Sequence, residues 1–174
     1  STLDWSSRGV KIRQSTAFPY GETSAIKVES VGQNAAFTLK IRRPAWAGDG
    51  FAVYVNGKPV TKMPQPGEGY VSITREWCAG DRVDVEFPMT LRAEPLPGSS
   101  KYIAFFYGPT LLVGDLGSAG LSQKDYFANP PSSPKSSWRL GKPIAMPRVP
   151  LSAAKDPSVC LERTIGGAIV FRLK

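Results

Sequence analysis

The sequence predicts an all-β protein: an antiparallel β-sandwich followed by a second, smaller or incomplete β-sheet. Short segments that alternate apolar and polar residues recur through the first half of the chain. No helical period of about ten or more residues appears there. Turn-forming pairs, above all Asn56-Gly57, separate the segments. One buried and one solvated face per strand is typical of antiparallel sheets.

The alternating segments of the first half follow one another closely. Apolar residues on one face alternate with charged or polar residues on the other at residues 10–13, 26–29 and 37–42. Pro44 ends the third segment, because proline cannot donate a hydrogen bond to a neighbouring strand. Residues 51–55 and 58–60 then flank Asn56-Gly57, the strongest short hairpin signal, since both turn residues tolerate positive φ.

Residues 69–89 predict a strand, a tight polar turn at Gly80-Asp81 and a second strand. Trp77 stands at the end of the first of these strands and is expected to anchor the core. In the second strand apolar and polar side chains point to opposite faces. The apolar set is Val83, Val85 and Phe87, and the polar set is Arg82, Asp84 and Glu86.

A seam rich in proline and glycine near residues 94–100 divides the chain. We therefore expect a β-sandwich domain at residues 1–93 and a second, smaller β domain at residues 94–174. Residues 102–113 are continuously apolar, which indicates strands covered on both sides, either by a second sheet or by a neighbour that this chain lacks. A long surface loop rich in Pro, Ser and Gly is predicted at residues 115–158, and a last strand follows Gly166-Gly167.

Composition excludes several classes of protein. The 174 residues are 41% hydrophobic and carry a net charge of +8, which suits a folded domain. No apolar run approaches a membrane span of roughly 18 residues, and no nucleic-acid-binding motif is present, so neither partner is expected. Many basic residues lie on polar strand faces, so we favour a solvated surface over a polyanion site. The chain begins at Ser1, so the compartment stays open.

Catalysis within these residues is not expected. The chain has no histidine, the commonest general base and metal ligand. Asp84 and Glu86 share a strand face, but nothing apolar in the sequence would raise the pKa of either carboxyl group. Cys78 and Cys160 are expected to remain separate thiols, and they are too few for a zinc site. We therefore predict no catalytic, cofactor-binding or metal-binding residue in this chain.

Binding through aromatic side chains stays open. Trp46, Trp138 and Tyr54 could each stack on a sugar ring. Each could instead pack on a neighbouring domain that this chain lacks. The sequence does not decide between a carbohydrate contact and an interdomain contact for these three residues.

Several of these segments, in this order, resemble the C-terminal region of glycoside hydrolase family 127, the β-L-arabinofuranosidases. The resemblance covers roughly residues 3–114 and includes the early Gln14–Pro19. The matching runs are Thr38–Ala47, Val53–Lys58, Gly69–Trp77, Gly80–Val83, Pro88-Met89 and Ala104–Pro109.

The resemblance implies an architecture of a helical (α/α) barrel followed by two β-sandwiches. Relatives carry their chemistry in the barrel, where a cysteine nucleophile lies near a zinc ion. Neither Cys78 nor Cys160 matches that motif, so no catalytic or zinc-binding role transfers to this chain. The implied partners are the absent N-terminal helical catalytic domain, a plant-derived glycan and a second copy in a homodimer.

Three functions therefore remain as hypotheses. The first is a non-catalytic accessory region that supports the catalytic barrel of a glycoside hydrolase. The second is a carbohydrate-binding module that uses exposed aromatic residues. The third is a basic module that binds polyanions, whose affinity would fall steeply with salt.

Overall fold

The computed structural model describes residues 1–33, 35–99, 101–114, 148–164 and 169–173. It confirms the all-β class, since every strand pairing in it is antiparallel. Within these ranges the only helical segments are single 3-10 turns, η1 (Ser6–Arg8), η2 (Leu151–Ala154) and η3 (Pro157–Val159). None of the described helices is long and apolar enough to cross a membrane.

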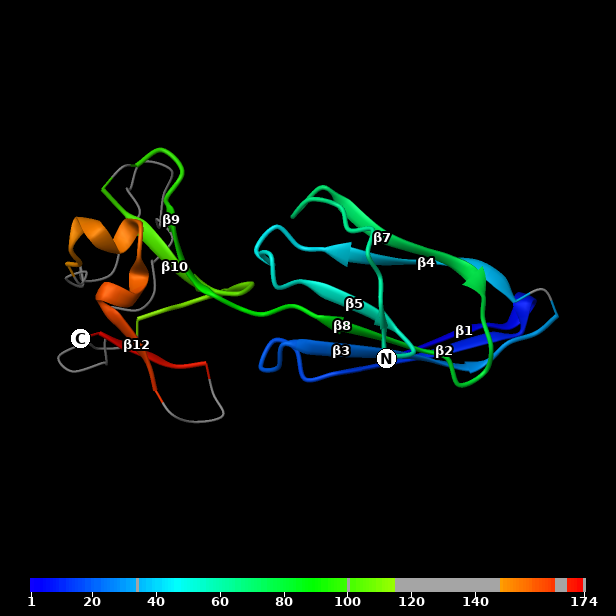
Figure 1. The fold of residues 1–174 in the computed structure, drawn as a ribbon. Coiled ribbons are helices and arrows are strands. Elements are labelled where there is room, and N and C mark those ends of the chain that lie inside the picture. The colour runs from blue at the N-terminus through cyan, green and yellow to red at the C-terminus, as the bar shows by residue number, and fades with distance from the viewer. Residues whose placement is uncertain (34, 100, 115–147, 165–168, 174) are drawn as a thin grey trace, which may run out of the picture.

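The first part of the chain builds a sandwich of two unequal sheets (Figure 1). The larger has six strands in the order β1-β2-β3-β8-β5-β6, and the smaller contains β4 and β7. The larger sheet comprises β1 (Thr2–Trp5), β2 (Val10–Thr16), β3 (Thr23–Ser30), β8 (Arg82–Glu86), β5 (Ala52–Val55) and β6 (Lys58–Pro59). The smaller sheet comprises β4 (Ala36–Arg43) and β7 (Gly69–Glu76).

The core lies between these sheets and is formed by the apolar side of the alternating strands. Val83 and Val85 of β8 are buried, whereas Arg82 and Glu86 on the same strand are exposed. Facing them, β7 contributes Val71 and Ile73. The period-two pattern in the sequence thus predicted which face of these strands is buried, because successive side chains point to opposite faces.

The predicted hairpin turn is confirmed. Asn56 and Gly57 connect β5 to β6 with positive φ angles of 50° and 77°. Asn56 also contacts the turn between β7 and β8: its Nδ2 donates to Asp81 Oδ1 (2.7 Å) and its Oδ1 accepts from the Arg82 amide (2.8 Å). Two turns that the sequence predicts separately are therefore hydrogen-bonded to each other.

The later part of the chain forms smaller sheets beside the sandwich (Figure 1). Its first strand, β9, begins only a few residues after β8 ends. One sheet has the order β11-β10-β9, and β12 pairs with β13. Their bounds are β9 (Leu91–Pro95), β10 (Ile103–Tyr107), β11 (Thr110–Leu111), β12 (Leu161–Arg163) and β13 (Phe171–Leu173).

Two expectations for this part differ from the structure or lie outside it. Within residues 102–113, Tyr102 and Leu111 are about half exposed and Val113 is 83% exposed, so the sheets of this chain do not provide all of the expected cover. Most of the predicted loop 115–158, and the turn at Gly166-Gly167, lie outside the described residues. The described end of that loop contains η2 and η3.

Candidate functional site

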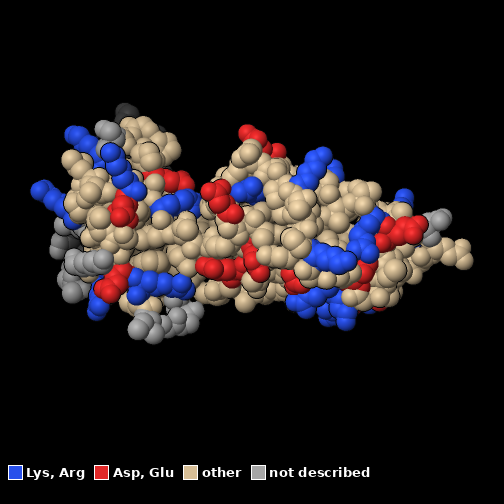
Figure 2. All heavy atoms as spheres, viewed as in Figure 1, with Lys and Arg blue, Asp and Glu red and all other residues tan. Residues whose placement is uncertain are grey.

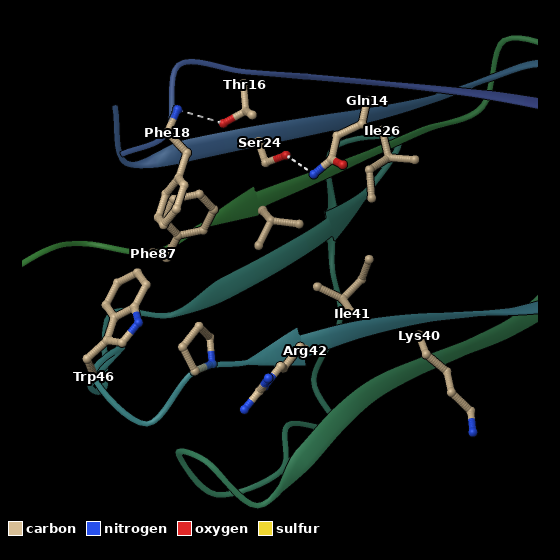
Figure 3. Close-up of a pocket in the computed structure, with 12 residues that line it drawn as sticks. Gln14, Thr16, Phe18, Ser24, Ile26, Lys40, Ile41, Arg42, Trp46 and Phe87 are labelled. Carbon is tan, nitrogen blue, oxygen red and sulfur yellow. Dashed lines mark hydrogen bonds between the residues drawn. The ribbon is translucent and has the colours of Figure 1, made fainter. Parts of the chain in front are cut away.

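A groove of about 400 Å³ lies between the two sheets of the sandwich. The larger sheet lines it with residues of β2, β3 and β8, and the smaller sheet lines it with β4. Figure 3 shows Ile26 and Ile41 pointing toward each other across it, whereas the side chains of Lys40 and Arg42 point away. The groove is therefore an opening along one side of the sandwich core.

Three aromatic side chains gather at one end of this groove (Figure 3). Trp46 stacks on Phe18 with ring centroids 6.2 Å apart and meets Phe87 edge-on at 6.1 Å. Phe18 is 43% exposed, so its ring extends the apolar surface to solvent. Trp46, one of the aromatic candidates from the sequence, thus lies half-buried in a groove wall.

Trp46 is held in place by a buried arginine. Arg43 donates through Nη1 to the Pro64 carbonyl (2.7 Å) and through Nη2 to the Gly48 carbonyl (3.0 Å). Its guanidinium also lies 5.6 Å from the Phe51 ring centroid. Because these contacts tie the loop after β4 to the loop before β7, they fix the segment that carries Trp46.

The uncharged polar side chains of the groove form hydrogen bonds with neighbouring groups. Gln14 Nε2 donates to Ser24 Oγ (2.9 Å). The Thr16 hydroxyl donates to the Thr23 carbonyl (2.8 Å) and accepts from the Phe18 amide (3.0 Å). None of the described groove residues carries a carboxylate. The groove can accept apolar side chains, but it offers no pair of groups for acid–base catalysis.

The other two aromatic candidates do not join Trp46. Tyr54 lies on β5 opposite Asp84, and its hydroxyl approaches Glu86 Oε2 at 3.5 Å. It is on the outer face of the larger sheet, since its neighbour Val53 is buried in the core. Trp138 lies outside the described residues. The structure therefore assembles no shared platform from Trp46 and Tyr54.

The acidic pair Asp84 and Glu86 occupies the same outer face. Asp84 binds the Arg82 guanidinium at 2.7–2.9 Å, a contact along the strand rather than across a cleft. Neither carboxylate lines the groove. These positions favour the solvated strand face that we expected over a glycosidase pair.

The cysteines are not joined to each other: Cys78 is exposed and Cys160 is buried. Among the described residues no group of three or more Cys, Asp or Glu side chains could hold a metal ion. This donor set does not fit a zinc site, which requires about four close ligands.

A polar contact that we did not predict joins the sandwich to the later sheets. Tyr107 of β10 donates its hydroxyl to Glu22 Oε1 (3.1 Å) and accepts from Arg163 Nη1 of β12 (2.7 Å). Glu22 Oε1 also accepts from the Met89 amide (3.1 Å), and Arg163 lies 4.8 Å from the Tyr107 ring centroid. We call Glu22, Tyr107 and Arg163 the junction triad.

Burial raises the pKa of the Tyr107 hydroxyl, and its hydrogen bond to Glu22 raises it further. The phenol therefore stays a hydrogen-bond donor throughout the neutral range. In the sequence Tyr107 stands out only as part of a family motif, and neither Glu22 nor Arg163 stands out at all. No local signal could have found them, because the two bonds span 85 and 56 positions of the chain.

Replacing Tyr107 with Phe is expected to lower the free energy of unfolding by about 1–2 kcal/mol, because both junction bonds are lost at a buried site. Urea unfolding measures the change. Tyr20→Phe is the matched control, since Tyr20 is 68% exposed, and its effect should stay within about 0.5 kcal/mol. A double-mutant cycle with Glu22→Gln that shows no coupling would contradict the triad.

Charges of both signs are interspersed over the visible face of the molecule (Figure 2). Across the outer face of the larger sheet, Arg13, Lys27 and Arg82 lie in register on three adjacent strands. Two of these are neutralised locally, since Arg13 pairs with Glu29 and Arg82 with Asp84. Such pairing favours solvated strand faces over a continuous polyanion surface.

Comparison with known proteins gives a consistent result. A family model described as "Beta-L-arabinofuranosidase, GH127 middle domain" matches residues 1–89. Among solved structures, one described as a glycoside hydrolase is similar with a TM-score of 0.56 and 26% identity over 63% of this chain. A GH127 β-arabinofuranosidase is similar with a TM-score of 0.54 and 27% identity over 64% of this chain.

A third similar structure is a GH127 β-L-arabinofuranosidase from Geobacillus stearothermophilus, with a TM-score of 0.54 and 31% identity over 64% of this chain. The match spans only 19%, 20% and 18% of these three solved chains. No curated protein matches this chain.

Proposed function

The chain belongs to the GH127 β-L-arabinofuranosidase family, and on that premise we propose that it is a non-catalytic accessory region of a glycoside hydrolase. Its sandwich and the following sheets would support a helical catalytic domain that precedes them in a longer polypeptide. They would thus lie toward the C-terminal end of that polypeptide. The proposed support includes buttressing the catalytic barrel and shaping one wall of its cleft.

The match of residues 1–89 to a middle-domain model carries this proposal. The chemistry of the chain is consistent with it. Among the described residues the groove contains no carboxylate, Asp84 is paired with Arg82, and no metal-binding cluster occurs. Catalysis, and any zinc ion that it uses, are accordingly proposed to belong to the helical domain.

The experiment compares three proteins on a chromogenic aryl β-L-arabinofuranoside: this chain, the parent polypeptide and the parent without residues 1–174. We expect the chain alone to be inactive and the parent to be active. Removal of residues 1–174 should lower both the activity and the melting temperature of the remaining catalytic domain. In the proposed parent these residues cover an apolar face of that domain, and the face would become exposed. Hydrolysis by the chain alone, or an undiminished truncated parent, would refute the accessory role.

The aromatic end of the groove supports one alternative, a carbohydrate-binding module that uses Trp46 with Phe18. Affinity electrophoresis in gels that contain arabinan or arabinogalactan distinguishes the two functions. A supporting region migrates unchanged in these gels, whereas a binding module is retarded. A homodimer and a glycan partner remain proposals of the same kind.

A further inference from the structure

The two sheets of the sandwich are unequal along one side. The larger sheet continues through β3, β2 and β1, but the smaller sheet stops at β4, which pairs only with β7 among the described strands. The groove lies along this side of β4. The outer edge of β4 is therefore a strand edge beside an apolar hollow.

The pairing register shows which backbone groups of β4 face that edge. The Trp77 amide donates to the Ala35 carbonyl (3.1 Å), which marks this pair as a hydrogen-bonded one of the ladder. Every β4–β7 pair follows the same register, and bonded and non-bonded pairs alternate in antiparallel ladders. The odd residues of β4 thus bond to β7, whereas Thr38, Lys40 and Arg42 direct their N–H and C=O groups to the open edge.

The floor of the groove is suited to the side chains of an added strand. A second hollow of about 190 Å³, lined by Leu3, Ile12 and Leu39, adjoins the first and shares Gln14 and Ile26 with it. Together they follow the chain from Leu39 of β4 to Pro44 just beyond it, a length of roughly 17 Å at about 3.3 Å per residue. That length accommodates a strand of about six residues.

We propose that this edge of β4 binds an extended segment of the parent polypeptide, which adds a strand to the smaller sheet and fills the groove. Backbone hydrogen bonds to Thr38, Lys40 and Arg42 would provide the pairing, and alternate apolar side chains would pack on Ile26 and Ile41. The β4 edge lacks two of the usual protections against such pairing, since it is eight residues long and its register with β7 shows no bulge.

Charge determines the kind of segment that fits. Side chains of the added strand that face outward would lie beside Lys40 and Arg42, both exposed. Acidic residues at these positions would form favourable cross-strand pairs, whereas like charges directly opposite each other are destabilising. A second copy that paired through its own β4 would bring Lys40 and Arg42 of both copies together. An acidic strand is therefore favoured over a symmetric dimer.

The source of the strand follows from the position of Ser1, and this step rests on the proposed function. Ser1 lines the second hollow, and its amino group donates to the Gln14 carbonyl (2.9 Å). In the proposed parent, the polypeptide that leads into Ser1 is attached directly beside the groove. Attachment raises its effective concentration there, so we assign the strand to the part of the parent that precedes Ser1.

Amide hydrogen exchange tests the inference residue by residue. In the isolated chain the amides of Thr38, Lys40 and Arg42 should exchange fast, and those of Leu39 and Ile41 slowly. In the parent the first three should become protected by at least about tenfold. Unchanged exchange in an active parent overturns the docking and leaves the proposed function intact. Protection in an inactive parent supports the docking and overturns the function.

Three further measurements keep the test decisive. Lys40→Pro removes one edge amide without breaking a bond to β7, so the isolated chain should stay folded while protection of Thr38 and Arg42 in the parent is lost. Lys40→Arg keeps both the amide and the positive charge and should preserve that protection. Concentration-dependent protection in the isolated chain identifies a second copy at the edge and overturns the proposal.

A peptide with capped termini and acidic residues at the outward positions should bind this chain several-fold tighter than the same peptide with lysine at those positions. Equal binding of the two peptides overturns the acidic assignment.

Discussion

Replacing Trp77 with Ala is expected to lower the free energy of unfolding by about 3–5 kcal/mol. Trp77 is only 1% exposed and is the largest fully buried side chain of the described residues. Its ring stacks on Phe37 at 5.5 Å, and its Nε1 donates to the Phe37 carbonyl (3.0 Å). The substitution would leave a cavity at the end of the core and remove one hydrogen bond to the Phe37 carbonyl.

Chemical denaturation followed by circular dichroism measures this loss. Trp77→Phe separates the contribution of packing from that of the hydrogen bond, because it keeps most of the apolar contact but loses the Nε1 donor. It should lower the free energy of unfolding by less than Trp77→Ala does. Trp5→Ala is the matched control, since Trp5 lies on the outermost strand β1 and is 40% exposed. Equal losses for Trp5→Ala and Trp77→Ala would contradict the core role of Trp77.

The second large effect is expected at Asp81. Its Oδ2 accepts from the Cys78 amide (2.9 Å), its Oδ1 accepts from Asn56 Nδ2 (2.7 Å), and Arg75 lies 3.6 Å from Oδ2. Asp81→Ala should lower the free energy of unfolding by about 2–3 kcal/mol, because it leaves the donors at two turns without their charged acceptor.

The stability contribution of Asp81 should also depend on pH. The Cys78 amide and then the Asn56 side chain hold the pKa of this carboxyl group below its ordinary value, and burial only partly opposes them. A lowered folded-state pKa stabilises the native state at pH values above the ordinary value of about 3.9. That contribution is lost as the pH falls from about 5 through the folded-state pKa.

Unfolding measured between about pH 3 and pH 7 tests this dependence. Asp81→Asn cannot ionise, so its free energy of unfolding should change less over that interval than that of the wild type. An unchanged slope for Asp81→Asn would show that Asp81 is not the group responsible.

Much of the sandwich could be predicted from the sequence because its determinants are local. Alternation indicated which residues of β8 are buried, and Asn56-Gly57 marked a turn whose positive φ angles few other residues adopt. Trp77 could be assigned to the core from its place at a hairpin end. The absence of histidine from the sequence is enough to exclude the commonest catalytic arrangements.

The candidate groove was only partly predictable. Trp46 was singled out as an aromatic residue, but nothing local indicated that Phe18 and Phe87 would pack on it from separate segments. The cover expected over residues 102–113 is incomplete at Val113 in the described structure. An apolar run records a tendency to be buried, and it does not specify a partner.

The sequence by itself determined the β class, the buried face of each alternating strand, the hairpin at Asn56-Gly57 and the family resemblance. These properties depend on residues that are close along the chain, where periodicity and turn chemistry act directly. Only the tertiary structure decided that Asn56 binds Asp81, that Tyr107 joins Glu22 to Arg163, and that one edge of β4 stays open. Each of these depends on which distant segments become neighbours, a choice set by the packing of whole sheets rather than by any local pattern.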